Sequence, residues 1–391
     1  KYYPMSSVQR RMFIIDEVGA DLSYNLPEAF ILCGKLDIEK FRKAVNELVE
    51  RHDAFRTEFG IRNGEYVQVI KDRVDFDIDI RTIEEAGNRS VRELFFDFVK
   101  PFDLTKAPIA RIQLIKYSDD KFLVMYDMHH IIFDGMSQII LMEEFIDLYN
   151  GKTLEPLKLQ YKDYSTWFSG IDLSKQRGFW MDEFEDGVPI VELPTDYPRP
   201  QKQSFKGNSI TINLSDEVVS KIEKLSRITG ATEYMVWLSV LMIVLSKYSR
   251  QEDIVVGSPI SGRTNRDTEG IVGMFVNTLA MRGKPEGNKS FREFLGEIKE
   301  TCLRVYENQD YPFESLVEAL DINKDSSRNP VFDVMFVLQN NEPIDRKING
   351  ISEYHHVTEN GDTSMFDLTI EIKKYPEASL RVEYCTELFR C

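Results

Sequence analysis

The sequence predicts a mixed α/β protein built as two lobes, and three observations support this fold class. The chain has 391 residues, more than the roughly 250 to 300 over which one hydrophobic core usually extends. Strand-like and helix-like apolar patterns alternate in both halves of the chain. Between the halves, residues 187–207 hold prolines among polar residues, as an inter-lobe linker does. The expected lobes are therefore residues 1–186 and 208–391.

The composition is that of a globular chain and excludes some partners. With 42% hydrophobic residues the chain should fold, and a net charge of -16 argues against nucleic-acid and anionic membrane partners, which need clustered Lys and Arg. The longest apolar run, near residues 235–245, is shorter than the roughly 20 residues that span a bilayer, and no secretory pattern opens the sequence. The scattered cysteines predict neither a disulfide framework nor a zinc site. These features predict a protein of the reducing cytoplasm.

The first half contains several helices and strands with clear signals. Residues 38–52 form the clearest helix, because Asp37 can cap it and apolar residues recur at helical spacing. His52 falls on that apolar face and is read as a core-edge histidine. Ser90 and Glu93 form a capping box for another helix. The other expected elements are a Ser-capped helix over residues 6–13 and strands over residues 29–33, 74–80, 109–117 and 121–128, of which the last two are expected to pair as a hairpin.

The last of these strands ends in M-H-H-I-I-F-D-G, residues 128–135, which combines an imidazole pair, a carboxylate and a turn residue. If the strand persists through His130, then His129 and His130 point to opposite faces, and only one can face a given cleft. A metal site made from the pair is therefore not expected. The spacing from His130 to Asp134 suits metal ligation only on a helix, which the Asp-Gly turn signal argues against.

Gly135 and Ser137, which follow the histidine pair, are expected to shape the turn. Gly135 permits a positive φ or a close backbone approach, and Ser137 can cap a helix over residues 138–149. The residues themselves leave an alternative open. In that alternative the two histidines are simply buried at a strand end, and Asp134 is only a turn residue.

The second half starts with a strand near residues 210–214 and a Ser215-capped helix that stops at Gly230. Thr232 then caps a helix that is apolar nearly all round, which predicts burial. A short strand over residues 254–256 leads into a turn-rich loop up to Arg263. Strand, helix and strand in this order favour a mixed α/β lobe.

Two aromatic or histidine-rich segments have ordinary structural interpretations. Tyr164 and Trp167 lie at helical spacing in Y-K-D-Y-S-T-W and can simply pack a helix. His355 and His356 are expected in a solvated loop, because no carboxylate or cysteine stands at metal-ligand spacing in the sequence.

Taken together, seven segments in chain order resemble the core motifs of the condensation domains of nonribosomal peptide synthetases, within the H-x-x-x-D acyltransferase superfamily. The resemblance covers essentially the whole chain. The segments are S-S-V-Q-R-R-M-F (6–13), R-H-D-A-F-R-T-E-F (51–59), M-H-H-I-I-F-D-G (128–135), Y-K-D-Y-S-T-W (161–167), V-G-M-F-V-N-T (272–278), N-Q-D-Y-P-F-E (308–314) and S-R-N-P (327–330). The opening motif and the pair Tyr24-Asn25 look most like the subtype that joins an L-configured donor to an L acceptor.

The resemblance implies a V-shaped pseudo-dimer of two chloramphenicol-acetyltransferase-like lobes with a central tunnel. Donor and acceptor peptidyl carrier proteins would dock at opposite mouths of the tunnel, each sending in a phosphopantetheine arm that bears an acyl thioester. The acceptor's α-amine would attack the donor thioester and form a peptide bond. The domain itself would bind no cofactor or metal, and its neighbours would be synthetase domains such as adenylation domains.

The resemblance also implies roles for single residues. His130 would be the catalytic histidine, while His129 and Asp134 would be mainly structural. Asp134 would pair with an arginine, for which Arg51 and Arg263 are both candidates. Gly135 would let the acceptor arm pass close to the backbone. The residues expected near the tunnel and substrate are Phe275, Val276, Asn277 and Trp167.

Other members of the superfamily remain as alternatives. An epimerase-type relative keeps the histidine pair, but V-G-M-F-V-N-T fits condensation better. A heterocyclising relative would carry aspartate in place of the histidines, and a coenzyme-A-dependent acyltransferase would carry a D-F-G-W-G-type motif, which we do not find. A non-catalytic module that recruits carrier or tailoring proteins would be expected to lose His130 or Gly135. The family also continues beyond a segment like residues 384–389, so the last helix of the second lobe is expected to be missing here.

Overall fold

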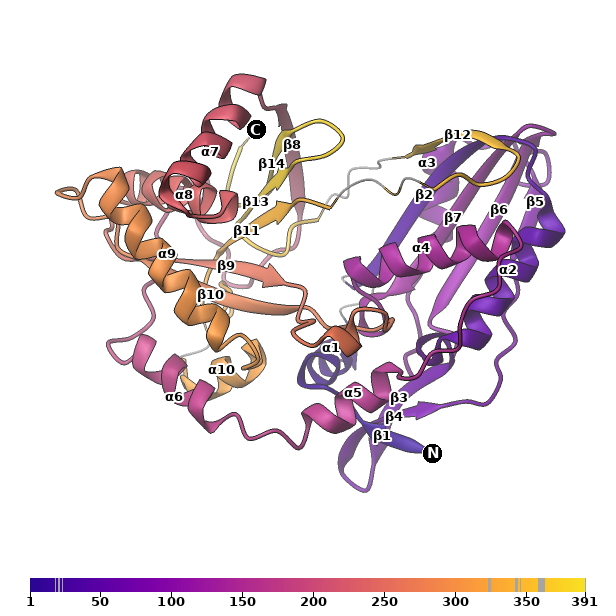
Figure 1. The fold of residues 1–391 in the computed structure, drawn as a ribbon, viewed down its shortest axis with the longest axis horizontal. Coiled ribbons are helices and arrows are strands. Elements are labelled where there is room, and N and C mark those ends of the chain that lie inside the picture. The colour runs from indigo at the N-terminus through magenta and orange to yellow at the C-terminus, as the bar shows by residue number, and fades with distance from the viewer. Residues whose placement is uncertain are drawn as a thin grey trace. The chain divides into compact units, whose positions relative to one another are not determined.

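The structure is a computed structural model, and it describes residues 1–17, 19, 22, 24–322, 325–341, 344, 346–357 and 363–390 (Figure 1). Contacts divide the chain into two compact units. Unit 1 comprises Lys1–Ile171, Arg263–Val276 and Ile344–Glu359, and unit 2 comprises Asp172–Gly262, Asn277–Pro343 and Asn360–Cys391. The chain therefore returns twice to unit 1 after entering unit 2. The lobes expected from the sequence are continuous, residues 1–186 and 208–391 with a linker between them. These boundaries stay a prediction.

Unit 1 contains a five-stranded sheet in the order β12-β2-β7-β6-β5. Neighbouring strands are antiparallel except β5 and β6, which are parallel. A smaller antiparallel sheet has the order β1-β4-β3. The strands of unit 1 are β1 (Tyr2–Pro4), β2 (Asn25–Gly34), β3 (Thr57–Arg62), β4 (Glu65–Ile70), β5 (Asp79–Thr82), β6 (Ala110–Ser118), β7 (Lys121–His129) and β12 (Ile351–His356). The pairing of β6 with β7 confirms the hairpin that leads to the histidine pair.

Helices cover both faces of the larger sheet. Successive strand side chains point to opposite faces, so β7 supplies Val124 and Met128 to a core shared with α2 and α4, and Leu123 and Met125 to a core shared with α3. Figure 1 shows α2 and α4 running across the sheet. The helices of unit 1 are α1 (Ser7–Glu17), α2 (Ile38–Arg51), α3 (Val91–Phe98), α4 (Gly135–Tyr149) and α5 (Tyr161–Phe168), with short 3₁₀ helices at Asp53–Arg56, His130–Ile132 and Arg266–Thr268.

Two expected caps in unit 1 are confirmed, and one strand is shorter than predicted. The Asp37 side chain accepts a hydrogen bond from the backbone of Lys40, and Ser90 and Glu93 form the capping box of α3. The alternation over residues 74–80 produces a strand only from residue 79 onward, as β5. Val74 and Phe76 still pack against the core of unit 1. Their alternation therefore reflects burial, although these residues do not pair with another strand.

Unit 2 is built on a six-stranded sheet in the order β10-β9-β11-β13-β14-β8, in which β11 is parallel to both β9 and β13. Its strands are β8 (Gly207–Asn213), β9 (Ile254–Ile260), β10 (Asn277–Gly283), β11 (Val334–Gln339), β13 (Leu368–Lys373) and β14 (Ser379–Cys385), and its helices are α6 (Ser174–Glu183), α7 (Asp216–Thr229), α8 (Glu233–Ser249), α9 (Phe291–Glu307) and α10 (Phe313–Ala319). The mixed α/β class is confirmed.

The two predicted caps in unit 2 are also confirmed. Ser215 and Thr232 cap α7 and α8, and Gly230 ends α7 in the left-handed conformation at φ 63. The all-round apolar character of α8 reflects its burial, since Val236, Leu238 and their neighbours lie in the core of unit 2. Among the described residues no single helix is long and apolar enough to cross a membrane; α7 and α8 pass that test only as a pair, bent by 109°.

Candidate active site

The histidine pair lies where β7 passes into a short 3₁₀ turn. The strand ends at His129, and His130–Ile132 form the turn before α4 begins at Gly135. The His130 backbone N–H donates to the Tyr24 carbonyl at 2.8 Å. The strand therefore stops one residue before His130. The different surroundings of the two histidines come from this change of backbone geometry and not from strand alternation alone.

His129 is enclosed by protein. Its side chain is only 2% exposed and lies beside the rings of Tyr24 and Phe102. Its Nδ1 accepts a hydrogen bond from the Ile131 backbone N–H at 3.2 Å, so a neutral ring carries its proton on Nε2. Burial, and secondarily the neighbouring His130, lowers the pKa of His129 to about 3. His129 is therefore a neutral structural group that holds the start of the turn.

His130 is half-buried, and its hydrogen bond sets its tautomer. Its Nδ1 lies 2.7 Å from the carbonyl oxygen of Phe133. A carbonyl only accepts, so Nδ1 must carry the proton, and in the neutral ring the lone pair lies on Nε2. Within the described part of the chain, Nε2 has no hydrogen-bond partner and is not among the buried unpartnered atoms. The lone pair on Nε2 of His130 is therefore accessible to solvent.

The electrostatics keep this nitrogen unprotonated at neutral pH. Burial lowers the pKa of His130, and the hydrogen bond to Phe133 and the carboxylate of Asp134 oppose that shift without reversing it. Because the ordinary pKa of histidine is near 6.5, a lowered pKa means that the neutral ring dominates at about pH 7. His130 can therefore accept a proton without first losing one.

Asp134 lies at the other end of the turn and is fully buried, at 0% exposure. Its carboxylate accepts hydrogen bonds from the backbone N–H and hydroxyl of Ser137, both at 2.7 Å, from the Arg263 guanidinium at 3.1 Å and from the Phe275 N–H at 3.1 Å. One terminal nitrogen of the Arg263 guanidinium also donates to the carbonyls of Thr268 and Ile271, at 2.6 and 2.7 Å, while its buried Nε has no partner among the described residues. The carboxylate thus fastens the segment 263–276 to the start of α4.

This geometry corrects two expectations from the sequence. Asp134, and not Ser137, is the N-cap of α4, and the helix begins at Gly135 instead of residue 138. The Asp side chain accepts from the N–H three residues ahead, as capping requires, and Ser137 completes the cap. Gly135 is accordingly a helical residue and not one of the positive-φ glycines. A Cβ there would meet nothing within 4 Å, so the residue leaves open space beside the backbone.

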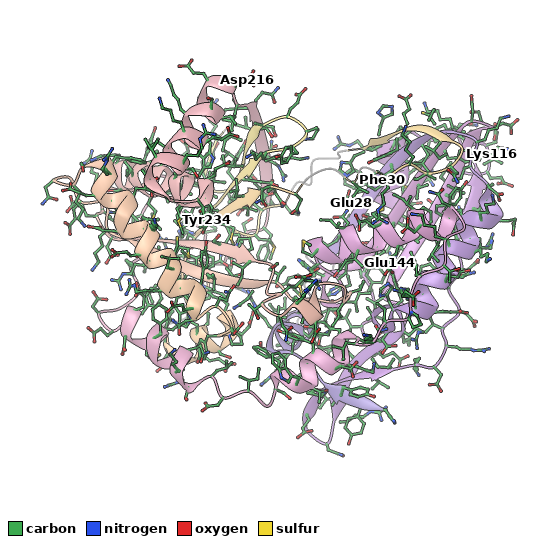
Figure 2. All side chains as sticks on the ribbon, in the orientation of Figure 1. Glu28, Phe30, Lys116, Glu144, Asp216 and Tyr234 are labelled. Atoms are coloured by element: carbon green, nitrogen blue, oxygen red, sulfur yellow. The ribbon has the colours of Figure 1, made fainter. Side chains whose placement is uncertain are left out.

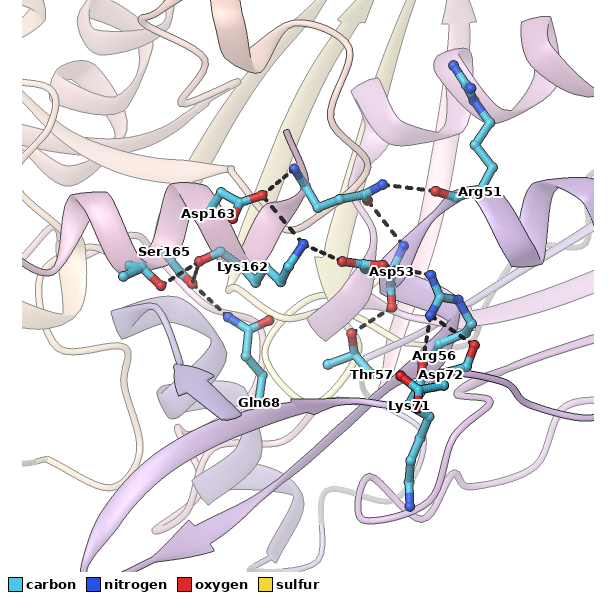
Figure 3. A network of polar contacts seen from close by, with 12 residues as sticks. Arg51, Asp53, Arg56, Thr57, Gln68, Lys71, Asp72, Lys162, Asp163 and Ser165 are labelled. Carbon is cyan, nitrogen blue, oxygen red and sulfur yellow. Dashed lines mark hydrogen bonds and ion pairs between the residues drawn. The ribbon is translucent and has the colours of Figure 1, made fainter. Parts of the chain in front are cut away.

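Of the two candidate arginines, Arg263 pairs with Asp134, whereas Arg51 pairs with Glu144. The Arg51 guanidinium binds both Glu144 oxygens, at 3.0 and 3.1 Å, and the Glu155 carbonyl at 2.6 Å. His52 also lies 2.7 Å from the Glu144 carboxylate and is 0% exposed, so it is a core histidine. Glu144 lies on α4 (Figure 2), so Arg51 joins α2 to α4. The backbone of Arg51 belongs to a neighbouring polar network (Figure 3).

The residues expected near the tunnel fall in three different surroundings. The Phe275 ring lies 4.1 Å from the Arg263 guanidinium and 4.5 Å from the Tyr164 ring, which makes it part of the Asp134 support. Val276 packs against the core of unit 1. Trp167 is 53% exposed at the end of α5. The expectation that these side chains lie near substrate stays a prediction.

Asn277 accounts for the conformation of the segment N-Q-D-Y-P-F-E, residues 308–314. As the first residue of β10, it donates its side-chain amide to the carbonyls of Gln309 and Tyr311, both at 2.9 Å, and accepts from the Phe313 N–H at 3.0 Å. The segment N-Q-D-Y-P-F-E therefore wraps around a single amide inside unit 2.

Sequence reasoning missed a group of residues beneath the turn. The Tyr161 hydroxyl lies 2.5 Å from the Met274 carbonyl, to which it must donate, and 2.9 Å from the hydroxyl of Ser6. A Cβ at Gly273 would meet the Tyr161 ring at 2.0 Å, so only glycine fits there. Gln9 donates to the Ile131 carbonyl at 3.2 Å. The S-x-x-Q spacing of residues 6–9 is the one local signal that could have identified Gln9.

The structure also corrects the reading of the second histidine pair. His355 and His356 lie in β12 and not in a loop. Ligand atoms of Cys33, Glu353 and His355 lie within 4.8 Å of one another, because β12 pairs with β2. The Glu353 and His355 side chains are 61% and 60% exposed, and three such ligands do not form the closed four-ligand cage of a structural zinc site.

An apolar cavity of about 110 Å³ lies inside unit 1, between the sheet and helices α2 and α4. Met128 and Phe133, which flank the histidine pair in sequence, are among its lining residues, and no charged side chain is. The lining residues with hydroxyl or amide groups are Tyr126, Gln138 and Tyr354, and the first two are hydrogen-bonded to each other at 2.7 Å. The cavity therefore offers no group that could take up a proton.

The comparisons with known proteins decide the family. The model of the Condensation domain family matches residues 1–391. The chain belongs to the condensation-domain family. It is 43% identical to bacitracin synthase 3 of Bacillus licheniformis and 43% identical to gramicidin S synthase 2 of Brevibacillus brevis, and each match covers 100% of this chain. The chain spans only 6% and 9% of those two proteins.

Solved structures of condensation domains and related proteins share the fold. A four-domain nonribosomal peptide synthetase bound to AMP and glycine matches with a TM-score of 0.88 at 22% identity, over 100% of this chain and 32% of that one. The condensation domain of the monacolin K polyketide synthase MokA matches with a TM-score of 0.86 at 20% identity, over 100% of this chain and 93% of that one. The mixed α/β fold of condensation domains is thereby established for this chain.

The buried ion pair predicts that two substitutions in the turn lower the stability by unequal amounts. Asp134→Ala would leave the Arg263 guanidinium, whose side chain is 3% exposed, buried without its carboxylate, and should lower the free energy of unfolding by about 3 to 5 kcal/mol. His130→Ala removes a half-buried ring with one hydrogen bond and should cost about 1 kcal/mol. Urea unfolding of both variants beside the parent measures this. Equal stability of the two variants would contradict the division of roles.

Proposed function

We propose that this condensation domain forms a peptide bond between a donor aminoacyl or peptidyl thioester and the α-amine of an acceptor aminoacyl thioester. The observation that carries the proposal is the state of His130. A neutral ring, with Nδ1 bound to the Phe133 carbonyl and Nε2 free, can receive a hydrogen bond or a proton from an amine. The family and its synthetase relatives support this chemistry.

In the proposed reaction, the acceptor nitrogen attacks the thioester carbonyl carbon of the donor. The new C–N bond forms as the C–S bond breaks, and the donor arm leaves as a thiol. The nitrogen must lose a proton, which passes by way of Nε2 of His130 toward the departing sulfur. No oxidant, reductant or metal is needed for this balance. The lengthened chain remains on the acceptor arm.

The energetics favour orientation over activation. A free α-amine has a pKa near 7.7 to 8.0, so a useful fraction is already neutral at about pH 7. Holding two tethered reactants in line can supply up to roughly 7 to 11 kcal/mol, whereas a positioned base typically adds about 10²- to 10⁴-fold in rate. His130 therefore orients the amine and relieves the positive charge that develops on it.

The substrates of this reaction would arrive on other proteins. We propose donor and acceptor peptidyl carrier proteins as partners, with phosphopantetheine supplied by the carriers and no cofactor held by the domain itself. Adenylation domains would be neighbours in the same assembly. The relatives named above support this setting, because they are synthases many times longer than this chain. The motif S-S-V-Q-R-R and Tyr24-Asn25 favour an L-configured donor and an L acceptor.

The remaining site residues have proposed roles that follow from their surroundings. The open space at Gly135 would admit the acceptor arm beside the backbone. As the family resemblance implies, Phe275 and Val276 would lie near the path of the arms, Phe275 behind it through its contact with Arg263, and Asn277 would hold the first residues of β10 in place. Trp167, exposed on α5, would contact an arm or its carrier.

A recruiting module is the second candidate. The X-domain of teicoplanin biosynthesis, solved in complex with OxyB, shares the fold with a TM-score of 0.86 at 21% identity. Fold alone does not separate the two functions. His130 and Gly135, which a module without catalysis need not keep, are both present here. They favour catalysis.

A single-turnover assay tests the proposed function. One carrier protein is loaded with an aminoacyl donor and the other with an aminoacyl acceptor, and mass spectrometry follows the acceptor arm. The parent domain should produce a dipeptidyl arm, and His130→Ala should slow its formation by about 10²- to 10⁴-fold. Retained carrier binding without product from the parent would instead favour the recruiting module.

The lowered pKa of His130 predicts the pH dependence of the rate. The neutral ring is the active form, so its contribution should rise with pH, with a midpoint below the ordinary histidine value of about 6.5. A second rise near pH 7.7 to 8.0 should come from the acceptor's α-amine. In His130→Ala only the upper rise should remain.

The same single-turnover assay across this pH range checks both rises. Replacing the acceptor by one with a less basic amine should shift only the upper rise. A rise that depends on His130 but has its midpoint above 6.5 would contradict the assignment.

A further inference from the structure

We propose that Gln9 is a positioning residue for His130, acting through the Ile131 carbonyl. The inference rests on the proposed role of His130 and extends it to a residue on a different helix. Gln9 lies in the first turn of α1 and is 2% exposed, and its side-chain Nε2 donates to the Ile131 carbonyl oxygen at 3.2 Å. That carbonyl belongs to the residue directly after His130.

The turn needs such a donor. His130–Ile132 form a 3₁₀ helix of only three residues, and the carbonyls at the end of a helix have no partner within it. Ile131 is 0% exposed, so solvent is not available to its carbonyl. A buried backbone carbonyl left unpaired costs about 1 to 3 kcal/mol. The amide of Gln9 removes that cost only when the Ile131 carbonyl points toward it, so it favours this orientation of the turn.

Capping of α1 explains the contacts of the Gln9 side-chain oxygen but not the hydrogen bond from its Nε2. Its Oε1 accepts from the Ser6 N–H at 3.1 Å, and its own N–H donates to the Ser6 hydroxyl at 3.2 Å, which is the reciprocal capping box of α1. A glutamate would complete that box equally well, because only an acceptor oxygen is required. The Nε2 group has a second role. Unlike an ionised carboxylate, the amide can accept a hydrogen bond from Ser6 and also donate one to the Ile131 carbonyl.

The start of α1 is itself held in place by hydrogen bonds, so Gln9 can fix the position of the Ile131 carbonyl relative to the rest of the site. The Ser6 hydroxyl lies 2.9 Å from the Tyr161 hydroxyl, which donates to the Met274 carbonyl at 2.5 Å. Burial raises the pKa of Tyr161, so this donor stays protonated. One residue further along the chain, the Phe275 N–H binds Asp134.

The turn that follows His130 is therefore held at two points. Gln9 holds the Ile131 carbonyl, and Arg263 with Phe275 hold Asp134. Between these two grips the His130 ring donates to the Phe133 carbonyl. Losing the Gln9 grip lets the Ile131 peptide rotate, which misplaces Nε2 without removing it. A displacement of about 1 Å at a reacting group can cost roughly 10²-fold in rate.

Three variants separate this role from plain stability. Gln9→Glu keeps the capping box, but an ionised carboxylate cannot donate to Ile131. Gln9→Met removes both functions with little change in size. Gln68→Met is the matched control, because Gln68 is equally buried, at 1% exposure, and its Nε2 binds the Pro4 carbonyl and the Ser165 hydroxyl away from the turn (Figure 3).

The experiment measures the single-turnover rate at about pH 8, the acceptor-carrier concentration at half-maximal rate, and the Tm of each variant. Both Gln9 variants should be slower than the parent by about 10- to 100-fold, with the half-saturating concentration within about twofold. The histidine-dependent rise in the pH profile should also move in these variants. Gln68→Met should lose a similar amount of Tm as Gln9→Met but keep its rate and pH profile.

The proposal is overturned if Gln9→Met is no slower than Gln68→Met, or if its defect lies in the half-saturating concentration instead of the rate. The controls keep this separate from the proposed function. A parent domain that forms no product refutes peptide-bond formation, and a His130→Ala variant as fast as the parent refutes the role of the histidine. Both of these results differ from the one that would refute only the role of Gln9, in which the parent and Gln9→Met are equally active.

Discussion

The buried carboxylate of Asp134 is the interaction on which the site depends. An isolated charge at 0% exposure would be costly, and here it accepts hydrogen bonds from the backbone N–H and hydroxyl of Ser137, from the Phe275 N–H and from Arg263, which reaches both oxygens. These donors come from the start of α4 and from the segment 263–276, which returns to unit 1 from a distant part of the chain. The carboxylate thus fixes where the turn ends and where this segment lies.

The two adjacent histidines illustrate how backbone geometry divides chemical roles. His129 ends a strand among buried rings and holds the Ile131 N–H, so its neutral form is structural. His130 begins the 3₁₀ turn, and its ring is fixed by the carbonyl of Phe133. Burial lowers the pKa of both, but among these two rings only His130 has an unprotonated nitrogen that accepts no hydrogen bond from the described residues. The chemistry therefore rests on one ring whose tautomer is set by a backbone carbonyl.

Much of this could be predicted from local sequence, and the failures have a common cause. The caps at Asp37, Ser90 and Thr232, and the hairpin of β6 and β7, depend on neighbours in sequence and were predicted correctly. Local sequence favours Ser137 as the N-cap of α4, because an Asp-Gly pair is typical of a turn, whereas the structure has Asp134 there. The choice between Arg51 and Arg263 stayed open because their partners are distant in sequence. The cluster of Cys33 with Glu353 and His355, and the grip of Gln9 on Ile131, likewise join segments far apart in the chain.

The most direct test of this account is the tautomer of His130, read from the ¹⁵N chemical shifts of its ring in selectively labelled protein at about pH 7.5, where a neutral ring is expected. The His130→Ala variant identifies the signals among the five histidines of the chain. The account predicts a neutral ring with its proton on Nδ1 and an unprotonated Nε2. A proton on Nε2, or a charged ring at that pH, would contradict it, because the nitrogen assigned to the reaction would have no lone pair to offer.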